Sequence, residues 1–115
     1  MAVTGRDITD LYQGTTRTLD VSILDASGTA VDLSSVTGVE WVMAPNAYGT
    51  AVISKSLGDG IAITDEAGGL VTIALLPADT EDLPCGRYYH ECRVSEGENV
   101  TKVFTGHVTL LRDLI

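Results

Sequence analysis

The sequence is poor in the residues that mark special classes of protein. Its 115 residues include one Trp, four Tyr, one Phe, three Pro and two Cys, and two Cys are too few for a disulfide framework. No stretch approaches the roughly 18 apolar residues of a membrane span, and the segment from Met1 to Asp7 lacks the basic start and apolar run of a signal peptide. We therefore expect a chain made in a cytosol, with two buried free thiols and no membrane segment.

Basic residues are scarce as well. Seven Lys and Arg stand against 16 Asp and Glu, which gives a formal net charge of -9. Phosphate backbones and anionic membrane surfaces repel such a chain. The acidic residues are scattered along the sequence and are not gathered in a tail, which is typical of a solvated surface. The composition thus argues against nucleic-acid and membrane partners.

What the sequence does have is a strong alternation of apolar and polar residues. Apolar residues make up 44% of it, enough for one core, and the length fits a single domain over 1–115. The segment 15–24 places Leu19, Val21 and Ile23 on one face of a strand. The segment 38–44 does the same with Val39, Trp41 and Met43, and we expect Trp41 at the centre of the core. Further strands are predicted over 8–12, 29–33, 51–56, 61–63, 71–75, 87–94 and 100–111.

Turn residues separate these strands. Asp25 to Gly28 predicts a turn that joins two strands, and Glu96 to Asn99 predicts the turn of a C-terminal hairpin. Two registers are open for that hairpin: Cys92 faces Val103 or, with a one-residue bulge, Phe104. The bulged register clusters more apolar atoms, so it is favoured.

The sum is an all-β fold. Eight or nine short strands with turns every 8 to 12 residues favour an immunoglobulin-like, two-sheet antiparallel β-sandwich. One short helical turn is expected near residues 77–83, where Pro and acidic residues suit a helix start. Residues 1–6 and 111–115 are candidates for extended tails.

The residues of catalytic and metal sites do not come together in this pattern. Cys85, His90, Cys92 and His107 lack the spacing of a metal site, and a packed Cys with two partly exposed His residues explains them better. Glu91 follows His90 on one strand, so the two side chains point to opposite faces. We expect no enzyme, no cofactor and no structural metal.

Loop carboxylates leave one possibility open. Weak calcium binding is the alternative reading of four acidic residues, although the ligand ladder of a calcium loop is missing. These residues are Asp59, Asp65, Glu66 and Asp79.

Binding to other molecules is the remaining kind of activity, and two features could serve it. Tyr48 in a loop and Tyr89, which faces away from Tyr88, could contact proteins or carbohydrate. Leu111, Leu114 and Ile115 end the chain with apolar residues that could lie against a neighbouring protein.

The order of these motifs resembles small structural proteins of tailed bacteriophages, in particular the immunoglobulin-like amino-terminal domain of phage baseplate upper proteins. The resemblance covers about residues 8–110. It is carried by 12–15 (YQGT), 25–33 (DASGTAVDL), 39–43 (VEWVM), 58–61 (GDGI), 75–80 (LLPADT), 86–91 (GRYYHE) and 105–109 (TGHVT).

This resemblance implies a non-enzymatic virion protein that docks on other virion proteins of the tail, the neck or baseplate, or the head surface. It also implies a homo-oligomer that is synthesised in the cytoplasm of a host bacterium. A capsid decoration protein or the base of a head spike is the alternative on the same fold. A carbohydrate-binding module is the alternative from another class.

Overall fold

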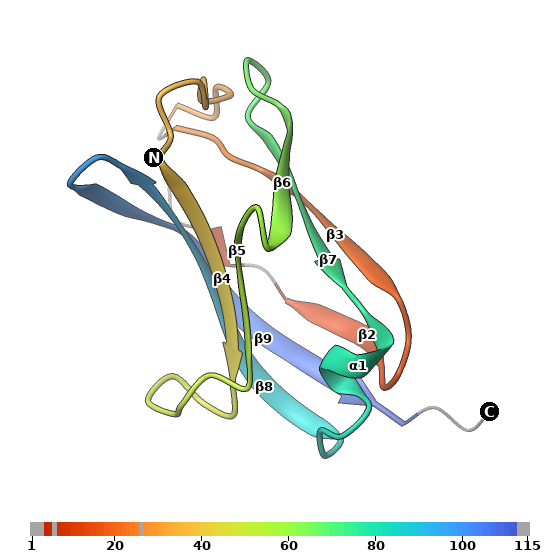
Figure 1. Ribbon diagram of the computed structural model, residues 1–115. Helices are drawn as coiled ribbons and strands as arrows, with labels where there is room; N and C mark the ends of the chain where they lie inside the picture. The colour runs from red at the N-terminus through yellow and green to blue at the C-terminus, as the bar shows by residue number, and fades with distance from the viewer. Residues whose placement is uncertain (1–3, 6, 26, 113–115) are drawn as a thin grey trace.

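The all-β prediction is confirmed by the computed structural model, which describes residues 4–5, 7–25 and 27–112 (Figure 1). These residues form nine strands and one helix of four residues. The strands are β1 (Thr4–Gly5), β2 (Ile8–Tyr12), β3 (Arg17–Ser22), β4 (Gly38–Ala44), β5 (Ile53–Leu57), β6 (Gly60–Asp65), β7 (Leu70–Leu75), β8 (Gly86–Glu96) and β9 (Asn99–Leu111), and the helix is α1 (Pro77–Thr80).

Hydrogen bonds join the strands into one mixed sheet. Its order is β1-β9-β8-β4-β5-β6-β7-β3, and β2 also lies on β9. The sheet curls until β2 and β3 face each other, so that it nearly closes into a barrel (Figure 1). Three pairs, β1–β9, β2–β9 and β5–β6, are parallel. The expectation of a wholly antiparallel arrangement is therefore wrong at these pairs, because alternation reports which face is buried and not the direction of the neighbouring strand.

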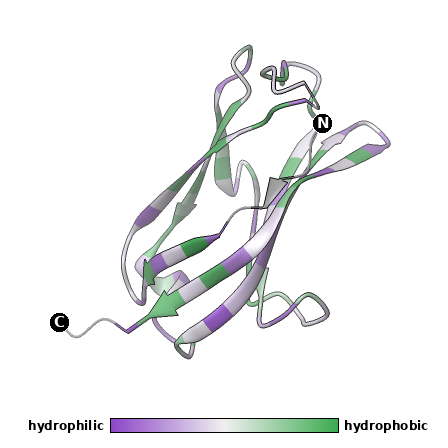
Figure 2. Ribbon diagram, turned by 180° about the vertical axis from the view of Figure 1, so that it is seen from behind, coloured by the Kyte–Doolittle hydropathy of each residue, from purple (hydrophilic) through white to green (hydrophobic). Residues whose placement is uncertain are grey.

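The apolar faces that the alternation predicted meet inside the curled sheet. Trp41 is completely buried on β4, as expected. Opposite strands bring Leu19 against Ile73 and Val21 against Val71 in the β3–β7 pair, and all four side chains are buried. Figure 2 shows the alternation as green and purple bands along the strands.

The C-terminal hairpin adopts the bulged register. Cys92 pairs with Phe104, the register shifts between Cys92 and Arg93, and Glu96 pairs with Asn99 at the turn. The bulge allows two consecutive residues, Val103 and Phe104, to be buried together. The preference for apolar clustering thus predicted the register correctly.

Two segments are less regular than expected. The predicted strand over 29–33 forms only an isolated bridge between Leu24 and Ala30. It is held instead by the N–H of Leu33, which donates to the carbonyl of Glu66 at 2.9 Å. The helix ends at Thr80 rather than near 83, and its start is fixed by Asp79, whose carboxylate accepts the Leu76 N–H at 2.7 Å and pairs with Lys55 at 2.9 Å.

Gly69 fixes the irregular segment to the β6–β7 turn. Its φ is +68°, and a Cβ added there would lie 2.8 Å from the carbonyl oxygens of both Ile23 and Val31. The carbonyl of Gly69 also accepts the N–H of Ile23 at 2.8 Å. The close approach of three backbone segments requires glycine at this position.

Comparing a Gly69 variant with a Gly97 variant separates the free-energy cost of this crowding from the cost of a left-handed backbone. Gly97 in the β8–β9 turn has a similar φ of +60° but nothing within 4 Å of an added Cβ. We expect Gly97→Ala to lower the free energy of unfolding by about 1 kcal/mol, and Gly69→Ala to lower it by a further ~1–3 kcal/mol because backbone atoms must move. Urea unfolding of both variants checks this. Equal losses would show that the Gly69 contacts are relieved at no cost.

Candidate docking surfaces

Tyr48 is the most exposed aromatic side chain of the described residues. It is 100% exposed, yet the loop that carries it is ordered by Asn46. The Asn46 side-chain oxygen accepts the Tyr48 N–H at 2.9 Å, and its carbonyl accepts the Gly49 N–H at 3.1 Å. The Tyr48 ring is therefore fully solvated and is not part of the core.

An apolar hollow begins where this loop leaves β4. The residues that line it are Pro45, Val52, Leu83, Pro84, Cys85, Gly86, Arg87 and Tyr88. The hydroxyl of Tyr88 donates to the carbonyl of Pro84 at 2.6 Å, which fixes the wall of the hollow. Cys85 is an exposed free thiol, so the expectation of two buried thiols holds for Cys92 and is wrong for Cys85. The strand predicted over 87–94 extends over Gly86–Glu96, so Cys85 lies just before it.

Tyr89 faces away from the buried Tyr88 as predicted, but its environment differs from that of Tyr48. Its hydroxyl donates to Glu91 Oε2 at 2.9 Å, and the Lys102 ammonium lies 2.9 Å from the same oxygen. The ring also meets His107 edge-on, with 6.2 Å between ring centres. Tyr89 is therefore half-buried in a polar cluster on the outer face of β8 and β9.

Glu91 and Lys102 in this cluster stabilise each other's charged forms. The hydrogen bond from Lys102 lowers the pKa of Glu91 although burial opposes it, and Glu91 in turn raises the pKa of Lys102. Burial and the bond to Glu91 raise the pKa of Tyr89. At neutral pH the cluster thus holds a carboxylate, an ammonium and a neutral phenol.

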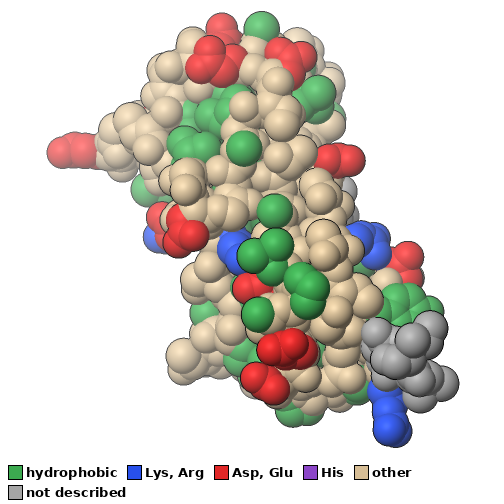
Figure 3. Space-filling view, turned by 45° about the vertical axis from the view of Figure 1, so that its right-hand side comes forward, with side chains coloured by type: hydrophobic (Ala, Val, Ile, Leu, Met, Phe, Trp, Pro, Cys, Tyr) green, Lys and Arg blue, Asp and Glu red, His purple; other side chains and the backbone are tan. Residues whose placement is uncertain are grey.

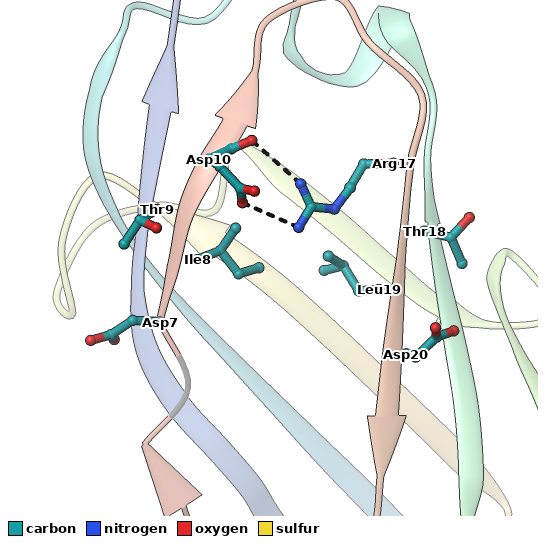
Figure 4. A pocket seen from close by; sticks show the side chains of 8 residues that line it. All are labelled: Asp7, Ile8, Thr9, Asp10, Arg17, Thr18, Leu19 and Asp20. Atoms are coloured by element: carbon teal, nitrogen blue, oxygen red, sulfur yellow. Dashed lines mark hydrogen bonds and ion pairs between the residues drawn. The ribbon is translucent and has the colours of Figure 1, made fainter.

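A polar seam opens between β2 and β3, where the curled sheet fails to close (Figure 4). Arg17 spans it, with one guanidinium nitrogen 3.3 Å from the Asp10 carbonyl and the other 3.2 Å from its carboxylate. The buried side chains of Ile8 and Leu19 point toward each other beneath this pair (Figure 4). The seam is lined by Asp7, Ile8, Thr9, Asp10, Arg17, Thr18, Leu19 and Asp20.

Leu111 belongs to the sheet. It pairs with Tyr12 in the β2–β9 ladder, and its carbonyl accepts the Gln13 N–H at 2.9 Å. Its side chain is half-buried. The other two predicted terminal contacts, Leu114 and Ile115, lie outside the described residues.

The two histidines differ sharply. His90 is completely buried, so the expectation that it is partly exposed is wrong, whereas His107 is exposed. The ring of His90 is accommodated because its Nδ1 accepts a hydrogen bond from Trp41 Nε1 at 3.0 Å. Trp41 and His90 lie 49 positions apart in the sequence, which hides this partnership. In the part of the chain that the structure describes, no three His, Cys, Asp or Glu residues are arranged to hold a metal ion.

Acidic side chains are visible at several places on the face shown in Figure 3, and basic ones at few. None of the described residues forms a helix long and apolar enough to cross a membrane.

Comparison of the chain with models of known protein families finds no match, and a search of curated proteins finds none either.

The polar cluster around Tyr89 predicts a dependence of stability on pH. The folded-state pKa of Glu91 is lowered, so its stabilising contribution is present above its ordinary pKa of 4.5 and is lost as the pH falls through the folded-state value. We expect Glu91→Gln to reduce the free energy of unfolding at pH 7, with a difference from the wild type that shrinks on acidification.

Urea titrations between neutral and acidic pH measure this difference. Glu98→Gln, which removes the same charge from the exposed β8–β9 turn, serves as the control. A Glu91→Gln difference that stays constant with pH would show that the pair with Lys102 does not stabilise the fold. Because Lys102 is half exposed, added salt should also reduce the difference.

Proposed function

We propose that this protein is a non-enzymatic structural protein of a tailed-phage virion, which docks on other virion proteins of the tail, the neck or baseplate, or the head surface. The observation that carries the docking role is Tyr48, a fully exposed ring on a hydrogen-bonded loop beside an apolar hollow. Rigid tyrosines supply contact area at protein interfaces for little loss of side-chain entropy. The sequence resemblance supports the assignment to a phage particle.

We infer that the fold is related to the immunoglobulin-like β-sandwich. Within the described residues, the antiparallel group β3-β7-β6 is joined to the rest of the sheet through only two residue pairs between β5 and β6. Each group can thus be regarded as one layer of a sandwich. Trp41 on β4 occupies the core as a Trp does on the third strand of antibody domains.

A second feature supports this relation. Tyr88 lies near the start of β8 and its hydroxyl returns to the carbonyl of Pro84, four residues upstream. Immunoglobulin-like domains have such a tyrosine corner at the start of the corresponding strand. In antibody domains a disulfide cysteine follows that Tyr by two residues; here the residue is His90, and it bonds to the core Trp41 instead.

The proposed assembly is a homo-oligomer bound to other virion proteins. A decoration protein or head-spike base would be present in many symmetric copies, whereas a tail or neck protein would form a few rings of fixed symmetry. Gold labelling of purified virions with an antibody to this protein tests the role. Label on the head supports decoration or a spike base, label on the tail or neck supports a component of those parts, and no label would overturn the virion role.

Tyr48→Ala tests the docking surface directly. Because the ring is fully exposed, we expect the urea midpoint to stay at the wild-type value while incorporation into virions falls. A central interface tyrosine contributes about 2 kcal/mol, which corresponds to roughly 30-fold in affinity. Val100→Ala, at a 57% exposed position on the hairpin, is the control. Normal incorporation of Tyr48→Ala into virions would contradict protein docking through this ring. Loss of binding to a glycan array, instead of loss of incorporation, would also contradict it.

Truncation tests the C-terminal contacts. Deleting residues 112–115 keeps the Leu111 carbonyl that accepts the Gln13 N–H, so we expect an unchanged β-sheet circular dichroism spectrum and weaker incorporation into virions. Deleting 111–115 also removes a paired residue of β9 and should lower the thermal midpoint. An unfolded 112–115 deletion would show that the end of the chain belongs to the core.

A further inference from the structure

We propose that the seam between β2 and β3 binds an extended segment of a partner protein in which Lys or Arg alternates with small apolar residues, and that this segment adds a strand to the β3 edge. The inference rests on the proposed docking function and names the chemistry of the partner.

The first support is the pairing of the two strands that border the seam. Among the described residues, β3 pairs only with β7, and β2 pairs only with β9. The register of β3 is regular, and the N–H of Ile23 points to β7, where it reaches Gly69. Because backbone groups alternate along a strand, the N–H and carbonyl groups of Thr18 and Ser22 face the seam. A strand edge of this kind is a template for an added strand.

The second support is the width of the seam. Most α-carbons of β2 lie more than 8 Å from every α-carbon of β3, whereas paired strands lie about 4.8 Å apart. The backbone N–H and carbonyl groups of the two strands cannot hydrogen-bond to each other across this gap. The gap is instead bridged at one point by the Arg17 side chain, which donates to the Asp10 carbonyl. A guanidinium thus takes the place of the backbone N–H that a neighbouring strand would supply.

The charge of the seam indicates which kind of partner segment it can bind. Two carboxylates, those of Asp10 and Asp20, and the single cation Arg17 line the seam, whereas the carboxylate of Asp7 points away from β3 (Figure 4) and accepts the His107 N–H at 2.9 Å. A second copy of this chain carries a net charge of -9 and is repelled, whereas a basic segment is attracted. A Lys or Arg of the partner can take over the Asp10 carboxylate, and Arg17 is then released from an exposed and weak ion pair.

The apolar residues of the seam, Ile8 and Leu19, determine which other side chains suit the partner. Ile8 and Leu19 are only 7% and 5% exposed, so little apolar area remains to be covered and large apolar side chains of a partner would gain little by contacting them. The affinity must then come from backbone hydrogen bonds and charge, and it should fall as salt is added.

The experiment uses the full ¹⁵N-labelled chain and a capped eight-residue peptide of alternating Lys and Val, with a Glu–Val peptide as the probe control. We expect amide shifts confined to residues 8–12 and 17–22, weaker at high salt and missing with the Glu–Val peptide. Shifts elsewhere, or equal binding of both peptides, would overturn the proposal.

Two pairs of variants sharpen the test. Thr18→Pro removes the N–H that faces the seam, while Thr18→Ala keeps it; we expect about tenfold weaker binding for Thr18→Pro only, the effect of losing one backbone hydrogen bond. Asp10→Lys should also weaken binding, and Asp59→Lys, which makes the same charge change in the β5–β6 turn, should not. Wild-type affinity of a folded Thr18→Pro, or equal losses in both Lys variants, would overturn strand addition at this seam.

Virion incorporation separates this proposal from the proposed function. If Thr18→Pro and Asp10→Lys are incorporated normally while Tyr48→Ala is not, the seam proposal fails and docking stands. If antibody finds no label on virions although the peptide binds the seam with the expected pattern, the virion role fails and the seam remains a binding site.

Discussion

A hydrogen bond inside the core connects two neighbouring strands of the sheet, β4 and β8. Trp41 on β4 donates its indole N–H to Nδ1 of His90 on β8, and both side chains are completely buried. Since Nδ1 accepts this bond, the imidazole carries no proton there. Phe104 of β9 packs against the same ring at 5.0 Å between ring centres. Removing either partner would leave a buried polar group, at a cost of about 1–3 kcal/mol, so three adjacent strands depend on this contact.

Alternation predicted the parts of the fold that depend on which face of a strand is buried. Leu19, Val21 and Ile23 all face the core as expected. The bulge opposite Cys92 was also predictable, because only that register brings Phe104 next to it. These features depend on short stretches of sequence, in which a shift by one residue would turn every apolar side chain toward water.

Other features depend on partners that are distant in the sequence. The parallel β2–β9 pair joins segments from opposite ends of the chain. The burial of His90 follows from a donor on another strand. The seam exists because two consecutive strands, β2 and β3, do not pair with each other, and neither strand carries a signal of that in its own residues. Among the candidate contacts, the exposure of Tyr48 was predictable from its loop, whereas the polar cluster around Tyr89 required the positions of Lys102 and His107.

The parallel pairing of β2 with β9 also decides how the protein responds to tension. The described chain enters β2 at one end of this pair and leaves β9 at the other (Figure 1). A pull on the two ends therefore acts along the strands and loads the hydrogen bonds between them in shear. Bonds loaded in this way share the force and must break together, whereas bonds at the end of an antiparallel hairpin would open one after another. The β2–β9 pair therefore resists tension along the strands better than a terminal antiparallel hairpin would.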